Sequence, residues 1–315
     1  MNTPVILIIF NRPSTTEKVF ETIRQAKPSK LLVIADGPRP DQVGEVEKCM
    51  AARSVIDKVD WYCEGLKKYS DSNLGCALSP ANGLNWAFEH VEEAIILEDD
   101  CIPHPTFYRF CEETLDRYRY DTRVMHISGN NYHPGIQRSD YSYFFSRYPL
   151  SWGWATWRRA WQNFDFVMKQ WPEIRTFNYL NDIFKEKRIA DSWAKTFQFV
   201  YDKNLDCWDF QWTFACFLQN GLSIIPSVNL VSNIGSGQDA THTTSENNHY
   251  LNRLVEPLSF PLKHSPYIIR DEHIDQLIQK TIFNYHPTLT QRIQAKFVQT
   301  LNRGKSVSKH CLNHI

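Results

Sequence analysis

The sequence has no surplus of charge of either sign and no paired cysteine motif. Its 35 Lys and Arg residues offset 35 Asp and Glu residues, which gives a formal net charge of zero. A nucleic-acid-binding protein needs surplus basic residues to displace counterions from phosphates, so the composition argues against this class. The eight cysteines include no C-x-x-C pair, which argues against a zinc knuckle or a redox dithiol and favours reduced, buried thiols.

Long apolar runs are also lacking. The apolar run at residues 5–10 is short, whereas a membrane-spanning helix needs about 20 such residues. This run has neither a basic leader nor a cleavage site, so we expect a strand there and no signal peptide. These absences favour a cytoplasmic protein, either soluble or peripheral at the inner face of a membrane.

Short apolar runs do alternate with helical segments along the first 100 residues. We expect strands at residues 5–10, 31–35, near 59–62 and at 94–97, with helices at 14–26, 42–53 and 80–90. Continuous apolar runs are typical of parallel strands that are buried on both faces. The alternation therefore predicts an α/β fold with a mostly parallel, doubly wound sheet flanked by helices, which binds ligands at the carboxyl ends of its strands.

The second half has a different character. We expect strands at residues 124–128, 141–145 and 223–226, with the middle one at a sheet edge. A polar segment rich in glycine and threonine at 234–248 predicts a mobile loop. No repeat or linker is visible, so we expect one domain over 1–265, with a nucleotide-sugar-binding half at 1–125 and an acceptor-binding half at 126–265. A helical extension is expected at 266–315.

The segment from Pro287 onward carries basic residues and no acidic one. Leu289, Ile293, Phe297 and Leu301 are four residues apart and would lie on one face of a helix. Such a basic amphipathic helix can lie on an anionic membrane surface. The alternative is a helix that packs on its own domain and keeps its charges in solvent.

Polar clusters follow three of the expected strands. Asn11 and Arg12 follow the first, Asp36 follows the second, and a run of three carboxylates follows the strand at 94–97. Mg²⁺ or Mn²⁺ needs few protein ligands when phosphate oxygens and water complete its coordination. Because a departing diphosphate gains negative charge, a cation at this strand end would stabilise it. The alternative for the three carboxylates is a solvated acidic turn. They are Glu98, Asp99 and Asp100.

Asp209 is the candidate general base because a tryptophan precedes it and aromatic residues follow it. Transfer with inversion needs one carboxylate that takes the proton of the acceptor hydroxyl. The alternative is that Asp209 caps a helix running from about Phe210 to Asn220. Trp152, Trp154 and Trp157 can stack on sugar rings, although we expect at least one of them to be core.

The ordered clusters resemble the nucleotide-binding half of GT-A glycosyltransferases, in which an acidic triplet replaces the D-x-D metal motif. The match is best with the inverting N-acetylglucosaminyltransferase I family and its bacterial relatives. Residues 151–161 resemble the Gly-Trp segment of this family, and Trp208-Asp209 resembles the Trp-Asp pair that holds its catalytic base. Residues 233–242 resemble the loop that closes over the donor. The similarity of order covers roughly residues 4–250.

The resemblance implies a role for each site residue. Asp100 would bind the metal, and Glu98 and Asp99 would lie at the nucleoside. Asn11 belongs to the same nucleotide-sugar site, and Arg12 would approach the diphosphate or the nucleoside. Asp36 would accept a hydrogen bond from the base N–H, with a plain Asp-Gly-Pro turn as the alternative. A further implied contact is that of His242 with the diphosphate or the metal.

The chain departs from the family at two points. It shows no counterpart of the family's membrane anchor, and residues 129–138, which would face the acceptor, match poorly. The sugar that the relatives use is therefore not carried over, and N-acetylglucosamine is only one candidate.

The function predicted from the sequence is an inverting, hexosyltransferase-type glycosyltransferase that depends on Mn²⁺ or Mg²⁺. The expected donor is a nucleotide-diphosphate sugar, with a UDP-sugar first, and the expected acceptor is a glycan or a lipid-linked precursor. A sugar-phosphate nucleotidyltransferase is an alternative, but it usually opens with a glycine-rich loop, and residues 10–16 contain no glycine. A non-catalytic carbohydrate-binding protein is the other alternative, and it would not need the acidic triplet together with Asp209.

Overall fold

The structure is a computed structural model that describes residues 1–136, 138–235 and 251–283. The chain divides into two compact units, Met1–Asp275 and Gln276–Ile315, and residues 276–283 are the described part of the second unit. The predicted site residue His242 and the basic segment from Pro287 onward lie outside the described residues. No helix in the described part of the chain is long and apolar enough to cross a bilayer.

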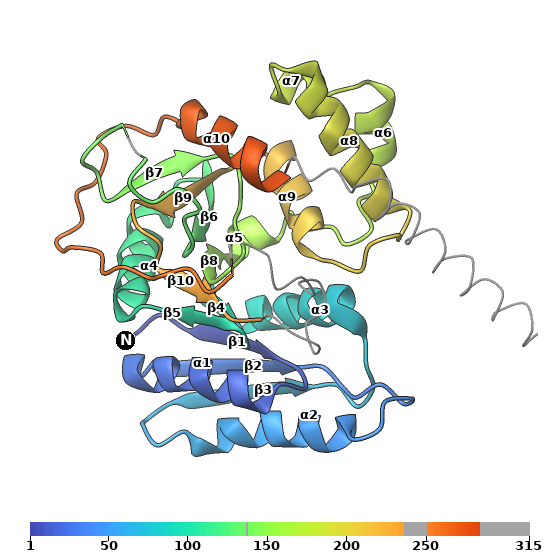
Figure 1. Ribbon diagram of the computed structural model, residues 1–315, viewed down its shortest axis with the longest axis vertical. Helices are drawn as coiled ribbons and strands as arrows, with labels where there is room; N and C mark the ends of the chain where they lie inside the picture. Colours follow the sequence, from blue (N-terminus) through green and yellow to red (C-terminus); the bar gives the residue numbers. More distant parts are fainter. Residues whose placement is uncertain (137, 236–250, 284–315) are drawn as a thin grey trace, which may run out of the picture. The chain divides into compact units, whose positions relative to one another are not determined.

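An eight-stranded sheet with the order β3-β2-β1-β4-β8-β6-β9-β7 forms the centre of the first unit (Figure 1). Neighbouring strands from β3 to β4 are parallel, β8 is antiparallel to both β4 and β6, β9 is parallel to β6, and β7 is antiparallel to β9. The mostly parallel α/β sheet predicted from the sequence is therefore confirmed. The strands are β1 (Val5–Ile9), β2 (Lys30–Ala35), β3 (Glu64–Tyr69), β4 (Glu93–Glu98), β6 (Val124–Ser128), β7 (Tyr143–Ser146), β8 (Trp154–Trp157) and β9 (Leu222–Pro226).

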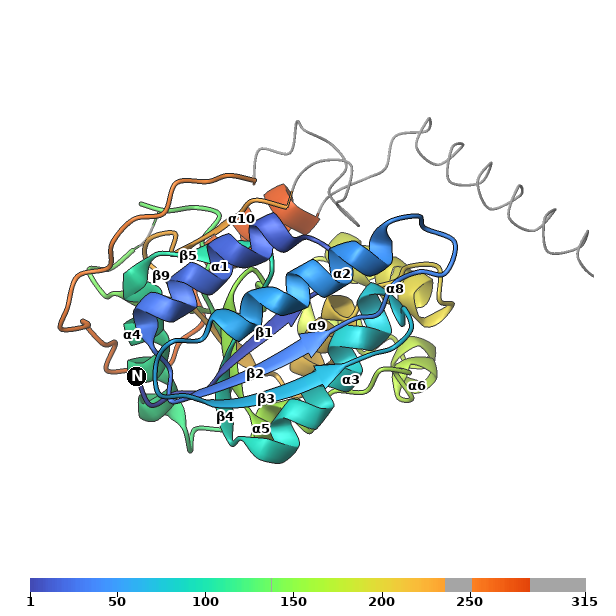
Figure 2. The same cartoon turned by 90° about the horizontal axis from the view of Figure 1, so that it is seen from below.

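Helices cover both faces of this sheet, and α1 and α2 lie side by side on one face, as Figure 2 shows. A second, two-stranded sheet pairs β5 (Cys101–Pro103) with β10 (Val231–Asn233). The helices are α1 (Pro13–Ala26), α2 (Glu45–Ser54), the 3-10 helix η1 (Val55–Lys58), α3 (Gly75–His90), α4 (Pro105–Tyr118), α5 (Arg158–Trp161), α6 (Trp171–Thr176), α7 (Leu180–Ile183), α8 (Lys187–Tyr201), α9 (Asp209–Leu218), α10 (Glu272–Ile278) and η2 (Gln279–Phe283).

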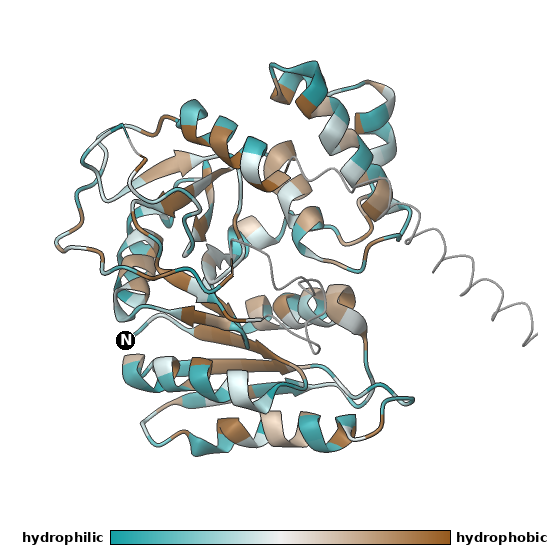
Figure 3. Cartoon of the chain, viewed as in Figure 1, coloured by the Kyte–Doolittle hydropathy of each residue, from teal (hydrophilic) through white to brown (hydrophobic). Residues whose placement is uncertain are grey.

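The apolar strands separate two hydrophobic cores. Val5, Leu7 and Ile9 of β1 pack in one core with residues of α1, whereas Ile6 and Ile8 pack in the other with residues of α3. Successive side chains of a strand point to opposite faces, so a strand with helices on both sides needs a continuous apolar run. Figure 3 shows this concentration of apolar residues in the central strands.

The expected elements differ from the structure at three places. The prediction of a strand near residues 59–62 is wrong, because the strand β3 begins later, at Glu64, and lies at the sheet edge. Its sequence, EGLKKY, is largely exposed, so it lacks the apolar run that marks a central strand. The helix expected from Pro80 begins earlier, at Gly75, and Pro80 lies inside it. Glu98, expected after its strand, is the last residue of β4.

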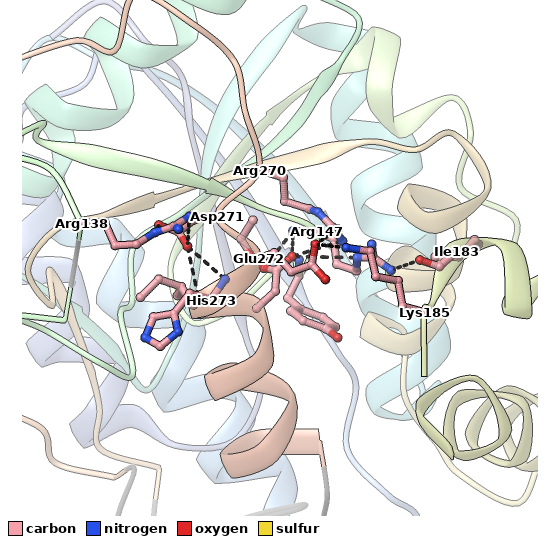
Figure 4. A network of polar contacts seen from close by, with 12 residues as sticks. Arg138, Arg147, Ile183, Lys185, Arg270, Asp271, Glu272 and His273 are labelled. Atoms are coloured by element: carbon pink, nitrogen blue, oxygen red, sulfur yellow. Dashed lines mark hydrogen bonds and ion pairs between the residues drawn. The ribbon is translucent and has the colours of Figure 1, made fainter. Parts of the chain in front are cut away.

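A polar network joins the end of β7 to the start of α10 and to the chain after α7 (Figure 4). The Asp275 carboxylate accepts a hydrogen bond of 2.5 Å from the Ser146 hydroxyl and lies 3.5 Å from Nη1 of Arg270. The Arg147 guanidinium donates to the Ile183 carbonyl and lies over the Phe184 ring. The last residue of α7 and Phe184 after it are thereby attached to Arg147, the residue that follows β7.

Candidate functional site

A cavity of about 570 Å³ lies at the carboxyl ends of β1, β2 and β4. Parallel strands present their carboxyl ends at one edge of a sheet, which is where such folds bind ligands. All of the sequence-predicted site residues within the described part of the chain line this cavity. They are Asn11, Arg12, Asp36, Glu98, Asp99, Asp100 and Asp209.

The three carboxylates stand where β4 turns into β5. Glu98 pairs with Ile8 of β1, Asp99 and Asp100 form the turn, and both aspartates are buried, with 2% and 8% of their surface exposed. Arg12, the N-cap residue of α1, donates to the Asp99 carboxylate and, over 3.0 Å, to Oδ2 of Asp100. Asp99 and Asp100 are therefore buried and paired, and Glu98 beside them is half-buried, so the triplet is not a solvated turn.

The carboxylates of this cluster outnumber the arginine, Arg12, that pairs with them in the described part of the chain. Burial, followed by the charges of Asp100 and Asp99, raises the pKa of Glu98 to about 8. Burial also raises the pKa of Asp99 to about 6, although Arg12 opposes the shift. Each carboxylate disfavours ionisation of its neighbours, because like charges at short range repel strongly in a medium of low polarity. A cation that enters the cavity would relieve this repulsion.

The donor set fits a hard divalent cation that has few protein ligands. Carboxylate oxygens are the ligands that Mg²⁺ and Mn²⁺ prefer. Among the described residues, no group of three or more His, Cys, Asp or Glu side chains is placed to hold a metal ion by itself. A cation bound at Asp100 would therefore take its remaining ligands from water and from phosphate oxygens.

Asp100 is held by the segment that follows β10. The Ile234 N–H donates to the Asp100 carbonyl over 2.8 Å, and Nδ2 of Asn233 donates to Oδ1 of Asp100 over 3.3 Å. Gly235 packs against the same carboxylate, because a Cβ atom there would lie 2.0 Å from Oδ2 of Asp100. Asn233 and Gly235 also line the cavity. The start of the segment that resembles a donor loop thus contacts the candidate metal ligand.

Asp36 already has a full set of hydrogen-bond donors. Its Oδ1 accepts from the N–H groups of Gly37 and Leu74, each over 2.9 Å. Its Oδ2 accepts from the Gly75 N–H and from Nδ2 of Asn73, each over 3.0 Å. Burial nevertheless raises the pKa of Asp36. These contacts favour the turn interpretation of Asp36, because a nucleobase N–H would have to displace one of the four donors.

A second buried carboxylate fixes Asn11. Glu45 at the start of α2 has only 3% of its surface exposed and accepts from Nδ2 of Asn11 over 2.8 Å. It also accepts from the backbone N–H and the guanidinium of Arg39, and the Arg39 guanidinium lies over the Phe10 ring. Arg39 lines the cavity, yet sequence reasoning missed it. The one feature of the sequence that could have pointed to Arg39 is that it follows Asp36 by three residues.

Asp209 is the first residue of α9, and Trp208 stands at the N-cap position. The carboxylate of Asp209 accepts from the Phe210 N–H over 3.0 Å, and Asp209 lines the cavity. The alternative interpretation is that Asp209 caps a helix that runs from about Phe210. The helix begins one residue earlier, at Asp209 itself, and the Asp209 carboxylate accepts an N–H of the first turn, so this structural role and a catalytic one can coexist.

The tryptophans divide between the core and the cavity wall. Trp154 and Trp157 lie on β8 with 0% and 2% of their surface exposed, so they are core residues. Trp152 is half-buried and lines the cavity. Trp208 also lines it and stacks on Trp154, with ring centroids 5.4 Å apart. One wall of the cavity is therefore aromatic and rests on the hydrophobic core.

The chain matches no protein-family model and no curated protein. Among solved structures it is similar to S. aureus TarS 1–349, with a TM-score of 0.41 and 13% identity over 72% of this chain and 58% of that one. It is also similar to HddC from Yersinia pseudotuberculosis, with a TM-score of 0.29 and 9% identity over 49% of this chain and 77% of that one. The complex of HddC with GMP-PN gives a TM-score of 0.30 over the same shares. Similarity at this level carries no inference about function.

Proposed function

We propose that the protein is a metal-dependent glycosyltransferase that moves a sugar from a nucleotide-diphosphate donor to an acceptor hydroxyl with inversion. The observation that carries this proposal is that the acidic cluster and Asp209 line one cavity of about 570 Å³. Sites for small ligands are typically cavities of about 300–1,000 Å³ with a few convergent polar groups. A UDP-sugar is the first donor to test, and a glycan or a lipid-linked precursor is the acceptor class.

Groups that line the cavity would stabilise the negative charge that develops on the departing diphosphate. Asp100 would hold Mn²⁺ or Mg²⁺, which supplies positive charge to the departing diphosphate. Arg12 would contribute a second positive charge beside Asp100, 3.0 Å from its carboxylate. The crowding of carboxylates at Glu98, Asp99 and Asp100 favours cation binding over binding of the diphosphate alone, because a cation relieves their mutual repulsion. This preference for a bound cation is the physical reason for the proposed metal dependence.

Asp209 would act on the acceptor. The acceptor oxygen forms a bond to the anomeric carbon while the bond from that carbon to the diphosphate oxygen breaks, and Asp209 takes the hydroxyl proton. Attack on the side opposite the leaving diphosphate inverts the anomeric configuration. Trp152 and Trp208 would give the sugars an apolar wall and limit the entry of water.

The proposal is tested by analysis of products from a panel of nucleotide sugars with Mn²⁺ and saccharide acceptors. We expect release of a nucleoside diphosphate and a product of inverted configuration by NMR. Asp209→Asn should lower kcat by about 10²–10⁴-fold, the usual contribution of a general base. Asp60→Asn is the matched control, because Asp60 pairs with Arg24 on the exposed surface. Pyrophosphate as a product would instead identify a nucleotidyltransferase, and a retained configuration would exclude inversion.

A further inference from the structure

The chain between α8 and α9 is mostly exposed until it reaches the cavity. Residues 202–204 are exposed, whereas Cys207 and Trp208 are buried, with 6% and 5% of their surface accessible. Asp206 is itself exposed, stands directly before this buried pair, and lines the cavity together with Asp209. The position of Asp209 therefore depends on how the residues immediately before it are anchored.

Asp206 is anchored on the first turn of α3. Its carboxylate accepts hydrogen bonds from the Cys76 N–H over 3.2 Å and from the Ala77 N–H over 3.0 Å. The Cys76 thiol donates in turn to the Asp206 carbonyl. These contacts join segments that are 130 and 129 residues apart in the chain. They attach the loop before the candidate base directly to the nucleotide-sugar-binding half.

Helix α3 lacks a cap of its own and leaves room for this carboxylate. Its N-cap residue is Leu74, which offers no side-chain cap, so the next N–H groups need another acceptor. An N-cap side chain normally bonds the second or third helical N–H, which here belong to Cys76 and Ala77. Gly75 has a φ of 88°, and a Cβ atom there would lie 2.8 Å from Oδ2 of Asp206. Asp206 thus serves as the cap of α3 from a distant part of the chain.

The segment has a second anchor next to Asp209. Trp208 is buried in the hydrophobic core, where its ring lies 5.4 Å from that of Trp154 and 6.3 Å from that of Trp161. Packing of Trp208 therefore holds this segment against the hydrophobic core. Asp206 adds a directional contact to α3, so Asp209 is held from the core side and from the α3 side.

We propose that Asp206 is a positioning residue that holds Asp209 at its place in the cavity by capping α3. This inference rests on the proposed function, in which Asp209 takes the proton of the acceptor. Asp206 itself takes no part in the proton transfer. Loss of its contacts releases the chain before Asp209 while the acidic cluster and its cation site stay in place. Acceptor chemistry should therefore suffer more than donor binding.

The kinetic test compares Asp206→Ala, Asp206→Asn and the matched control Asp202→Ala with the wild type. Asp202 belongs to the same exposed stretch, but its carboxylate accepts from the Gln198 side chain of the neighbouring helix α8. We expect Asp206→Ala to lower kcat at least tenfold and to leave the KM for the donor within threefold. Asp206→Asn keeps an accepting oxygen of the same size and should retain most of the turnover, because asparagine is also a good cap. Asp202→Ala should match the wild type.

Amide hydrogen exchange tests the anchoring without any need for activity. In Asp206→Ala, exchange should become faster in peptides that cover residues 75–78 and 206–210, and it should not change in α1. Wild-type turnover in Asp206→Ala, or equal losses in kcat and donor affinity, would overturn the positioning role. Unchanged exchange in both peptides would overturn the anchoring itself. If the wild type transfers no sugar, the proposed function fails, and the exchange result still decides whether Asp206 anchors the segment.

Discussion

Asp36 and Asp206 divide between them four consecutive backbone N–H groups at the start of α3. Asp36 accepts from Leu74 and Gly75, and Asp206 accepts from Cys76 and Ala77. A free helix N-terminus attracts anions because its N–H groups have no partners. Here two carboxylates already satisfy these groups. A diphosphate in the cavity would therefore bind near Arg12 and the cation site, and α3 would join the two sides of the cavity.

Replacement of Asp36 by alanine should destabilise the fold. Asp36 is buried, with 6% of its surface exposed, and its loss leaves three backbone N–H groups without this acceptor, whereas the Asn73 amide keeps the Gly37 carbonyl. Leaving buried donors unsatisfied costs about 1–3 kcal/mol per group, so we expect a loss of at least about 2 kcal/mol after water fills part of the gap. Urea unfolding measures this loss. Asp36→Asn should lose less, and equal losses in both variants would contradict the account.

Gly235→Ala should weaken metal-dependent nucleotide binding while the fold stays intact. The added Cβ atom would lie 2.0 Å from Oδ2 and 2.7 Å from Cγ of Asp100, so the carboxylate or the chain must move. We expect the affinity for nucleotide with Mn²⁺ to fall at least tenfold, about 1.4 kcal/mol, in calorimetric titration. Gly65→Ala is the matched control, because a Cβ atom there meets nothing within 4 Å. An unchanged affinity in Gly235→Ala would contradict the expectation that this glycine keeps the Asp100 carboxylate in place for the cation.

His126 should make stability depend on pH in the mildly acidic range. It is fully buried, its Nε2–H donates to the Leu150 carbonyl, and its Nδ1 accepts from the Trp212 ring over 3.1 Å. Burial lowers the pKa of His126 to about 3. Its ordinary value is about 6.5, so the unfolded chain binds the proton first and stability falls as the pH drops from about 6.5 toward 3.

The effect of one such histidine is at most about 1.4 kcal/mol per pH unit within that window. Urea unfolding of wild type and His126→Asn at several pH values between 7 and 5 isolates it. The variant should be less stable at pH 7, and its stability should fall less steeply with acid. Parallel stability curves for the two proteins would show that His126 does not carry the dependence.

Asp275 should contribute more to stability than any exposed ion pair near it. Its side chain has 6% of its surface exposed, and it faces the Arg270 guanidinium and the fully buried Ser146 hydroxyl. Asp275→Ala leaves the buried Ser146 hydroxyl without this acceptor, whereas Arg270 is 24% exposed and keeps Glu272, so we expect a cost of about 1–3 kcal/mol. Arg138→Ala, which removes the pair of this exposed arginine with Asp271 (Figure 4), should cost less than about 1 kcal/mol. Thermal unfolding of both variants would reveal similar losses if the network were merely a surface feature.

Much of the fold was predictable because burial on both faces leaves a plain sequence pattern. The apolar runs that became β1 and β2 ended within one residue of their expected positions. The edge strand β3 was misplaced because solvent covers most of its side chains and no apolar run is required. Helix α3 began before its expected start because the acceptors for its first N–H groups come from Asp36 and Asp206, both outside the helix.

The residues of the candidate site were likewise predictable only where a local sequence pattern marks them. The acidic triplet and Asp36 were visible in the sequence because they follow apolar runs directly, at the edge where parallel strands end. Asp206 and Glu45 were not visible, since their partners are a backbone turn and side chains distant in the sequence. Asp209 was found through the flanking aromatic residues, yet its place at the first position of α9 needed the structure. The predicted contact of His242 lies outside the described residues and stays a prediction.

The central claim is that Asp100 holds a cation through which a nucleoside diphosphate binds. Thermal unfolding with UDP, GDP, CMP and dTDP, each with and without Mn²⁺, tests it in the wild type and in Asp100→Ala. A ligand at 100 times its Kd adds about 2.7 kcal/mol, enough to raise the melting temperature by several degrees. The account predicts that one nucleoside diphosphate stabilises the wild type only with Mn²⁺ and that Asp100→Ala abolishes the effect. No stabilisation of the wild type by any nucleotide, or an equal effect in Asp100→Ala, would contradict it.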